Sequence, residues 1–287
     1  MESTRLMPSR LQSIAGLREV AERHRTLFVD QFGTMHDGRQ AYPRAAEALV
    51  RYRQSGGQVV VLSNSAKSGD DNRRRLEKLG FDGRHYDHVV TSGDAARRAI
   101  LDGRTDPAFA PGARVHVSGK AGDGYGFEHM GFSLVPPDDA EGIILAASQE
   151  PDRPWRTQVD ELSAAARRRI PVMVCNPDLE MLTPVGVRAS AGSIARELAR
   201  LGARVTTFGK PLPFIYGLAR EKLGGVSPAD VLAVGDSPEH DLQGALDSGI
   251  AAALVRTGIM TGCGEAEIGP RLPGQDAVFF GLDELAW

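Results

Sequence analysis

The chain has 287 residues, of which 41% are hydrophobic and 25% charged, and its formal net charge is −3. This is the composition of a soluble globular protein, and it lacks the basic excess expected for binding nucleic acid or an anionic membrane surface. No apolar run approaches the about 18 residues of a membrane span, and the N-terminus does not resemble a signal peptide. With two cysteines, Cys175 and Cys263, these features predict a cytoplasmic protein without a disulfide framework or a cysteine-bound metal.

Short apolar runs alternate with amphipathic segments along the chain. Runs rich in Val, Leu and Ile are typical of parallel strands covered on both faces, and they predict strands at 27–29, 59–62, 115–117, 143–146, 172–175, 231–234 and 252–255. The amphipathic segments predict helices at 43–57, 70–80, 94–101, 158–170, 193–202, 213–224 and 240–249. This alternation predicts an α/β fold with a mainly parallel sheet.

Two of the predicted helices carry clear end signals. Segment 43–57 begins with Pro43 and ends in a pair of glycines, which favours Pro43 as its first helical residue. Segment 70–80 has an acidic first turn and ends at Gly80, an arrangement that suits the helix dipole.

The chain is longer than the usual single domain of about 100–150 residues. Segments rich in Gly, Pro and Asp at 102–114 and 119–126 interrupt the strand–helix alternation. We therefore predict a core formed by residues 1–102 and 207–287, with a second α/β domain, residues 103–206, inserted between its two halves.

The first polar signal lies in the stretch LFVDQFGTMHDG, residues 27–38. Asp30 directly follows the apolar run, and the chain then turns at Gly33 and Thr34. In an open α/β sheet, ligands bind at the carboxyl ends of the strands, where a carboxylate can be a covalent nucleophile or a metal ligand. Taken alone, Asp30 is better explained as a helix cap or turn residue.

Three further polar signals have similar positions. Ser63 and Asn64 follow the run 59–62, where they could hold a phosphate or cap the next helix. Lys210 stands between Gly209 and Pro211, and a rigid loop would fix it as a point cation, although most lysines are merely solvated. Asp236 and Asp241 follow the run 231–234 and could converge on a hard divalent cation, whereas a turn with a helix cap would explain Asp236 alone.

The order and separation of these signals resemble the four motifs of the haloacid dehalogenase (HAD) superfamily of hydrolases. The motifs are Asp30 with Gly33 and Thr34, Ser63 with Asn64, Lys210, and GDSPEHD at 235–241. The forms TFGKPLPFIY at 207–216 and CNPDLEMLTP at 175–184 resemble the class IIA, p-nitrophenylphosphatase-like branch. The resemblance implies a Rossmann-like core with a large α/β cap between the second and third motifs, where the inserted domain is predicted.

The resemblance also assigns roles to the site residues. Asp30 would attack phosphorus and form an aspartyl-phosphate. Mg²⁺ would be held by Asp30, Asp236 and the backbone carbonyl of Phe32, with Asp241 in support. Ser63, Asn64 and Lys210 would hold the phosphoryl oxygens. Because Asp30 and the phosphate are both anions, the two cations would remove their repulsion.

Phe32 departs from the pattern of the phosphatases in the superfamily, in which a second Asp two residues after the nucleophile acts as general acid and base. That role contributes about 10²–10⁴-fold, and phenylalanine cannot fulfil it. Three interpretations follow: a phosphohydrolase with another proton donor or a good leaving group, a carbon–halogen hydrolase, or a binder of a phosphorylated metabolite without turnover. His36, Asp37 and Asp178 are candidate donors, although His36 suits a structural position and Asp37-Gly38 a turn.

The inserted region carries the candidates for substrate specificity. Asn176 and Asp178 could bind substrate hydroxyls or simply build a turn, and because Asp178 would be poor at meeting a second anion, they favour neutral groups such as sugars or polyols over bisphosphates. A sugar, polyol or sugar-acid phosphate is the expected substrate. Arg188 is a candidate contact for a second anion, and Trp155 and Tyr125 could stack on a ligand or lie buried at a domain seam. Because class IIA caps often mediate dimers, the resemblance also implies a homodimer.

Overall fold

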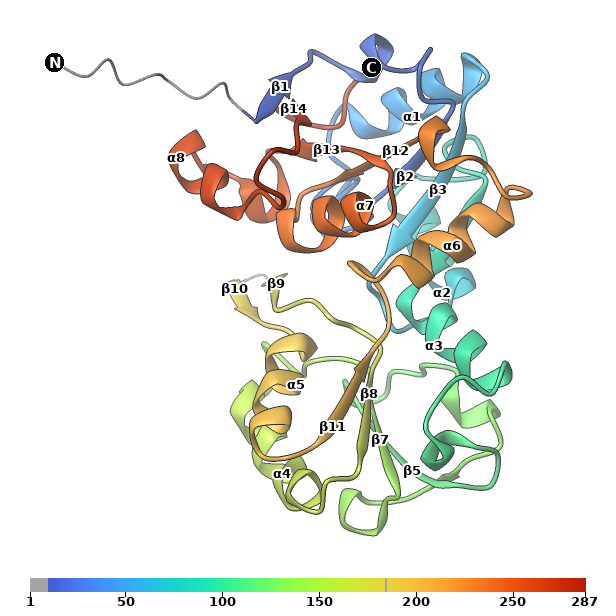
Figure 1. Cartoon of the computed structure of the whole chain (residues 1–287), viewed down its shortest axis with the longest axis vertical. Helices are drawn as coiled ribbons and strands as arrows, with labels where there is room; N and C mark the ends of the chain where they lie inside the picture. The colour runs from blue at the N-terminus through green and yellow to red at the C-terminus, as the bar shows by residue number, and fades with distance from the viewer. Residues whose placement is uncertain (1–9, 184) are drawn as a thin grey trace, which may run out of the picture.

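The computed structural model describes residues 10–183 and 185–287, which form two β-sheets with helices packed around them. The larger sheet has seven parallel strands in the order β1-β14-β13-β12-β2-β3-β4. In that order the strands span Leu11–Ser13, Phe279–Leu282, Ala251–Val255, Val231–Gly235, Thr26–Val29, Gln58–Ser63 and His88–Thr91. Figure 1 shows this sheet in the upper part of the molecule.

Both faces of this sheet are buried, as its continuous apolar runs predict. Along β2, Leu27 and Val29 belong to one hydrophobic cluster, whereas Phe28 belongs to another on the opposite face. The same alternation recurs in β3, where Val59 and Val61 face one cluster and Val60 and Leu62 the other. Successive side chains of a strand point to opposite faces, so the runs build two core layers at once.

Six α-helices accompany the larger sheet: α1 Ala45–Gln54, α2 Gly69–Lys78, α3 Ser92–Leu101, α6 Pro213–Lys222, α7 Gln243–Asp247 and α8 Glu265–Ile268. The prediction that Pro43 is the first helical residue is wrong, because α1 begins at Ala45 after a turn. The predicted helix at 240–249 is likewise only partly correct, since a π-helical turn over Pro238–Leu242 precedes α7.

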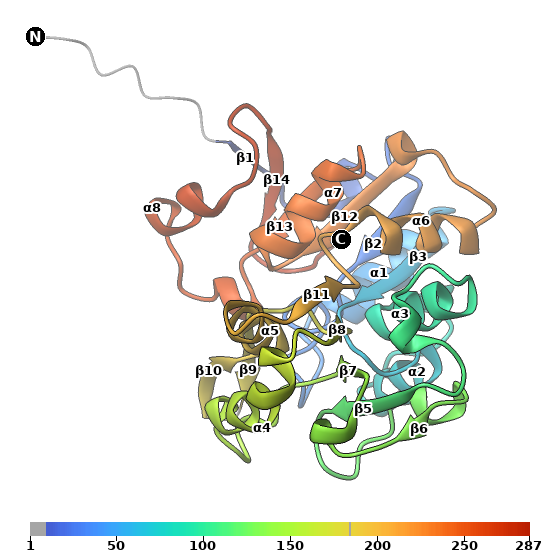
Figure 2. The ribbon, with the colours of Figure 1, turned by 60° about the horizontal axis from the view of Figure 1, so that its bottom comes forward.

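The second sheet has five strands in the order β11-β8-β7-β5-β6. They span Arg204–Thr207, Pro171–Val174, Gly142–Leu145, Arg114–Ser118 and Ser133–Leu134. Helices α4 (Trp155–Arg167) and α5 (Ala191–Arg200) pack against each other on one side of this sheet, and Figures 1 and 2 agree on this arrangement. A hairpin of β9 (Glu180–Thr183) and β10 (Gly186–Ala189) projects from it.

All seven strands predicted from the sequence are present, and the parallel α/β fold is confirmed. The strands of the second sheet lie between residues 114 and 207, which fits an inserted domain, but the boundaries proposed at 102/103 and 206/207 stay a prediction. In the described ranges, no helix combines the length and apolarity that crossing a membrane needs.

The parallel arrangement fixes where functional loops must lie. Strands β12, β2 and β3 are adjacent, and their carboxyl ends lead into Asp236, Asp30 and Asn64. Connections run from β2 toward β4 on one side and from β12 toward β14 on the other, so β2 lies at the switch point where ligands bind in such sheets.

The N-terminus of α3 supports the loop that follows β3. A Cβ atom added at Gly93 would lie 1.9 Å from the carbonyl oxygen of Ala66, so the backbones touch there. Gly217, inside α6, has no heavy atom within 4 Å of the corresponding position. The two glycines are therefore a matched pair, because both lie in helices and only Gly93 is required by packing.

We expect opposite effects when alanine replaces these two glycines. Gly217→Ala should raise the free energy of unfolding by about 0.5–1 kcal/mol through helix propensity. Gly93→Ala should lower it by about 1–3 kcal/mol because the backbones must separate. Urea denaturation of the two variants measures both, and equal effects would contradict the close contact between α3 and the loop after β3.

Candidate active site

The candidate active site is an open cleft at the carboxyl edge of the larger sheet. Its volume is about 2290 Å³, larger than the about 300–1,000 Å³ usual for a small-ligand pocket. The cleft is lined from both sheets and contains every residue of the predicted site: Asp30, Phe32, Ser63, Asn64, Asn176, Asp178, Lys210, Asp236 and Asp241. Residues separated by up to 211 positions therefore meet at one surface.

Three buried carboxylates form the centre of the cleft. Asp30, Asp236 and Asp241 each place one oxygen within 4.8 Å of the others, and none of the three residues is more than 8% exposed. Asp30 directly follows β2, and its backbone N–H donates to Val234 of the neighbouring strand β12 at 2.8 Å. The sheet register thus fixes the distance between the first and fourth motifs.

Burial and mutual repulsion disfavour ionisation of this cluster. Burial raises the pKa of Asp30 to about 7, although Lys210 acts in the opposite direction. Burial, reinforced by the charges of Asp30 and Asp241, raises the pKa of Asp236 well above its usual range. A cation between the three oxygens would reverse this penalty.

Glycines allow the backbone to approach the carboxylates. Gly33 has φ +93°, and a Cβ there would lie 2.0 Å from Asp236 Oδ2. A Cβ at Gly258, φ +59°, would lie 1.8 Å from the same oxygen, and one at Gly235 would lie 2.1 Å from Asp241 Cγ. No side chain fits at these three positions, so glycine is required for packing at all three and also for backbone conformation at Gly33 and Gly258.

Lys210 is buried between two of the acids. Its Nζ lies 2.5 Å from Asp30 Oδ1 and 2.6 Å from Asp241 Oδ1. Burial disfavours the ammonium ion, but the charges of Asp241 and Asp30 outweigh it and raise the pKa of Lys210 well above its usual value. Lys210 is therefore a permanent cation beside the candidate nucleophile, and the reading of a solvated surface lysine is wrong.

Lys210 follows a strand that the sequence did not reveal. It comes three residues after β11 of the second sheet, and Gly209 with φ +110° turns the chain toward the larger sheet. The side chain of Asn64 fixes this turn, because its Oδ1 accepts from the Lys210 N–H at 2.7 Å and its Nδ2 donates to the Lys210 carbonyl at 3.2 Å.

The Asn64 side chain also contacts the loop that follows β8 of the second sheet. Its Nδ2 donates to Asp178 Oδ1 at 2.7 Å, and Asn176 Oδ1 accepts from the Asp178 N–H at 3.3 Å. Asp178 further lies 3.6 Å from His240 Nδ1. Asn176 and Asp178 thus form a turn, which is one of the two roles predicted for them from the sequence. Both residues also line the cleft.

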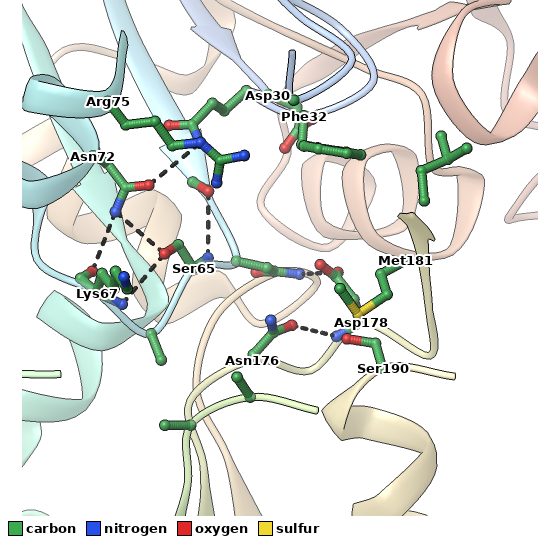
Figure 3. A pocket seen from close by; sticks show the side chains of 18 of the residues that line it. Asp30, Phe32, Ser65, Lys67, Asn72, Arg75, Asn176, Asp178, Met181 and Ser190 are labelled. Atoms are coloured by element: carbon green, nitrogen blue, oxygen red, sulfur yellow. Dashed lines mark hydrogen bonds between the residues drawn. The ribbon is translucent and has the colours of Figure 1, made fainter. Parts of the chain in front are cut away.

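A second polar group surrounds the loop after β3 (Figure 3). Ser63 Oγ accepts from the Ser65 N–H at 3.3 Å, and Asn72 Nδ2 donates to Ser65 Oγ at 3.2 Å and to the Ser68 carbonyl at 2.9 Å. The alternative that Ser63 or Asn64 caps the next helix is wrong, because Ser68 caps α2 by accepting from the Asp71 N–H. Within the described residues, the Ser63 and Ser65 hydroxyls accept hydrogen bonds but donate none, so each can still donate to a ligand.

Phe32 lies at the cleft with its ring packed edge-on against His36, at a centroid distance of 5.6 Å. Among the described residues, its backbone carbonyl accepts no hydrogen bond, which leaves this oxygen available to a cation. No carboxylate occupies position 32, so the geometry agrees with the sequence: an acid/base is absent here, whereas a metal-binding carbonyl is present.

The two candidate donors near Phe32 are engaged elsewhere. His36 is fully buried, its Nδ1 accepts from the Gly38 N–H at 2.9 Å, and burial lowers its pKa to about 4. It is therefore neutral at pH 7 and closed to the cleft. Asp37 Oδ1 accepts from the N–H groups of Arg39 and Gln40 at 2.8 Å each, which is a turn function.

Three other candidates have separate positions. Arg188 Nη1 donates to the Val187 carbonyl, and Arg188 does not line the cleft. Trp155 packs beside Arg156, whose guanidinium lies 4.7 Å from its ring centroid. Tyr125 lines the cleft but is 5% exposed, and its hydroxyl accepts from the Lys120 N–H. Tyr125 matches the reading as a buried side chain, whereas Trp155 is half-buried and does not line the cleft.

Sequence reasoning missed a loop that orients Asp236. After β13, the Ile259 N–H donates to Asp236 Oδ2 at 2.8 Å, and Thr257 Oγ1 donates to the Gly33 carbonyl at 2.6 Å. The signal was present, since the segment Arg256-Thr257-Gly258 follows a predicted apolar strand in the same way as the four motifs do.

The donors of this site fit a hard divalent cation. Three carboxylates and one carbonyl are oxygen ligands, which Mg²⁺ prefers, and few protein carboxylates suffice because Mg²⁺ retains several waters. The three clustered acids outnumber their cationic partners among the described residues, because Asp30 and Asp241 share one such partner, Lys210. The predicted ligands Asp30, Asp236 and Asp241 are thus in place for such an ion.

Comparisons with known proteins agree with this geometry. A family model described as haloacid dehalogenase-like hydrolase matches residues 27–133, and a second HAD-hydrolase-like model matches residues 207–278. The chain belongs to the haloacid dehalogenase-like hydrolases. The two matched segments carry all four motifs, and the region between them contains most of the second sheet.

Individual relatives cover nearly the whole chain. D-glycerol 3-phosphate phosphatase of Mycobacterium tuberculosis is 28% identical over 246 residues, which are 85% of this chain and 66% of that protein. The chain thus spans about two thirds of that relative's length.

Two solved structures show the same fold. A haloacid dehalogenase-like hydrolase from Brucella suis is 25% identical, with a TM-score of 0.79 over 95% of this chain and 99% of the other. Glycerol phosphate phosphatase of M. tuberculosis in complex with magnesium is 26% identical, with a TM-score of 0.64 over 84% of this chain and 70% of the other.

Replacing Asp236 should have opposite effects on the stability of the folded chain in the absence and in the presence of a divalent cation. In EDTA at pH 7, Asp236→Asn should raise the melting temperature, because burial and the neighbouring acids disfavour the Asp236 carboxylate that is ionised in the unfolded chain, while an amide oxygen can still accept from Ile259. Saturating Mg²⁺ should stabilise the native chain by about 2–3 kcal/mol at 100 times its Kd and stabilise the variant far less. Differential scanning fluorimetry with and without Mg²⁺ measures both.

Glu239→Gln is the matched control for this experiment. Glu239 lies in the same loop, but it pairs with Arg271 at 2.7 Å and does not belong to the carboxylate cluster. Its variant should keep the native response to Mg²⁺. An equal loss of response in both variants would indicate that the ion binds elsewhere or that loop integrity controls binding.

Proposed function

We propose that this protein is a Mg²⁺-dependent phosphatase that hydrolyses a small phosphorylated metabolite through an aspartyl-phosphate on Asp30. The observation that carries the proposal is the buried contact of Asp30 with Lys210, 2.5 Å apart, inside a cluster of carboxylates that suits a divalent cation. Such a site can accept an anionic phosphoryl group only when its own negative charge is balanced.

The chain's own residues supply the first step. A carboxylate oxygen of Asp30 forms a bond to phosphorus, and the bond between phosphorus and the leaving-group oxygen breaks. Lys210 and donors of the loop after β3, near Ser63 and Asn64, would bind the equatorial oxygens. When bound, Mg²⁺ would be held by Asp30, Asp236 and the Phe32 carbonyl, supported by Asp241, and would neutralise charge on the phosphoryl group.

Hydrolysis of the aspartyl-phosphate regenerates Asp30. Water attacks phosphorus, the bond to the Asp30 oxygen breaks, and phosphate leaves. Both steps require proton transfer, first to the leaving oxygen and then from water. Since Phe32 cannot transfer protons, we infer that leaving groups of low basicity react fastest. Of the two candidate acids that line the cleft, Asp37 uses its Oδ1 in a turn, so Asp178 is better placed to assist.

The names of the relatives support the reaction and the substrate class. A relative and a solved structure, both from M. tuberculosis, are named for action on a glycerol phosphate, a small polyol phosphate. A sugar, polyol or sugar-acid phosphate agrees with the Asn176–Asp178 turn at the cleft, whose polar groups can bind hydroxyls. A homodimer also stays a prediction that follows from the family resemblance.

The alternative functions are less well supported. A carbon–halogen hydrolase of this superfamily needs no metal, so the acids Asp236 and Asp241 of the fourth motif argue against it, although Phe32 resembles its aromatic residue. A binder without turnover would need no nucleophile, yet Asp30 stands at hydrogen-bond distance from a buried lysine. Both remain outcomes of the following test.

Replacing the nucleophile tests the proposal. Asp30→Asn should reduce phosphate release from a panel of sugar, polyol and nitrophenyl phosphates to the background rate, because the amide cannot form the covalent intermediate. Asp37→Asn is the control, since its carboxylate serves a turn, and it should keep most of the native rate. Chloride release from 2-chloropropionate without metal, or tight phosphate-ester binding without turnover, would favour the alternatives.

Restoring an acid at position 32 tests the role assigned to Phe32. Phe32→Asp should raise kcat for alkyl phosphates, whose leaving groups need a proton, by about 10²-fold or more, and raise it much less for p-nitrophenyl phosphate. Phe32→Asn has the same shape without the proton and should give no such selective gain. Steady-state kinetics with both substrate types decide, and a parallel change for the two would refute missing proton transfer as the limitation.

A further inference from the structure

Helix α2 presents three consecutive arginines, and they differ in their partners. Arg73 lies 3.2 Å from Asp70, and Arg74 lies 2.5 Å from Asp71, so each is neutralised on its own helix. Arg75 forms no ion pair, and its guanidinium donates no hydrogen bond within the residues that the structure describes. It lines the same cleft as Asp30 and Lys210.

The guanidinium of Arg75 lies beside Phe32. A Cβ atom added at Gly38 would be 2.6 Å from Cε2 of the Phe32 ring and 3.5 Å from Arg75 Nη2, so ring and guanidinium flank the same point. The charge of Arg75 also lowers the pKa of His36, after the larger effect of burial. Figure 3 shows Arg75 extending from α2 toward Asp30 and Phe32, one helical turn beyond Asn72.

Arg75 is exposed at the cleft, so its guanidinium is open to a ligand. Partial desolvation by nearby protein atoms lowers the pKa of Arg75, and Asp123, which acts in the opposite direction, is itself paired with Lys67 at 2.8 Å. Arginine binds carboxylate and phosphate groups through two parallel hydrogen bonds. An acid at position 32 would compete for Arg75 or repel a ligand anion, whereas the Phe32 ring does neither.

We propose that Arg75 is a specificity-determining residue that binds a second anionic group of the substrate, next to Phe32, while the transferred phosphoryl group lies at Asp30. This rests on the proposed phosphatase function and narrows its substrate class. The substrate is a phosphate monoester that carries a carboxylate or a second phosphate, such as the phosphate of a sugar acid. Phe32 is then the uncharged wall of the anion site.

Pairs of ligands that differ in one charge test this proposal. 2-Phosphoglycolate and 2-hydroxyethyl phosphate differ in a carboxylate against a hydroxymethyl group. Glucose 1,6-bisphosphate and glucose 6-phosphate differ in a second phosphate. Dissociation constants are measured by calorimetry with Mg²⁺ in Asp30→Asn protein, where no turnover occurs, and kcat/KM is measured in protein that retains Asp30.

Arg75→Gln should weaken binding of the doubly anionic member of at least one pair by about 10- to 100-fold and leave the singly anionic member little changed. Arg75→Lys should weaken binding of the doubly anionic ligand less than Arg75→Gln does, because lysine keeps the charge but cannot form two parallel hydrogen bonds. Arg73→Gln is the matched control, as a neighbouring arginine already paired with Asp70, and should leave both constants unchanged. The ligand pair that responds distinguishes a carboxylate from a phosphate.

Equal weakening of both members of each pair, or no change in either, would overturn the role of Arg75. This outcome is separate from failure of the proposed function. If no phosphate ester is hydrolysed but Arg75→Gln still abolishes discrimination in binding, the anion site stands and the phosphatase proposal fails. If esters are hydrolysed without any dependence on Arg75, the reverse holds.

Discussion

The charge balance around Lys210 is the constraint on which the rest of the site depends. Three buried carboxylates face one ammonium group, and Lys210 contacts two of them at 2.5 and 2.6 Å. One cation cannot balance three anions, so ionisation of all three acids would leave an excess of negative charge where burial makes charge most costly, and the pKa values of Asp30 and Asp236 are raised as a result. The surrounding glycines and the N–H groups of Ser237 and Ile259 hold the acids in place despite their repulsion. A divalent cation, together with Lys210, would balance the three carboxylates and allow an anionic phosphoryl group to approach.

Part of this arrangement follows directly from the sequence. The runs ending before Asp30, Asn64 and Asp236 have the pattern of strands buried on both faces, and parallel strands must place their carboxyl ends at one edge. The position of Lys210 was harder to predict from the sequence, because the preceding strand β11 has the alternating sequence Arg-Val-Thr-Thr and is only partly buried. Its position depends on Gly209 and on the bonds with Asn64, which are contacts across 146 residues that no local pattern encodes. The role proposed for Arg75 could not be predicted for the same reason, because the sequence does not show which of three adjacent arginines lacks an ion-pair partner.

Asn64 links three parts of the site that belong to different segments. One amide side chain accepts from and donates to the Lys210 backbone and also donates to Asp178. Any displacement of the second sheet that moves Asp178 therefore acts on the same side chain that fixes Lys210. Hydrogen bonds that share one side chain are coupled in energy, so binding at Asp178 and the position of Lys210 are expected to depend on each other.

Phe32 gives this site one negative charge fewer than a site with two catalytic acids would have. A carboxylate at position 32 would add a fourth negative charge near Asp30, and it would face Arg75 across the point beside Gly38. The uncharged ring avoids that charge, retains a backbone carbonyl for a cation, and leaves the guanidinium for a ligand. The cost is slower proton transfer to the leaving group. If the ligand brings its own anion to Arg75, its binding energy can hold the ester in position for attack by Asp30, and better positioning can offset part of that cost.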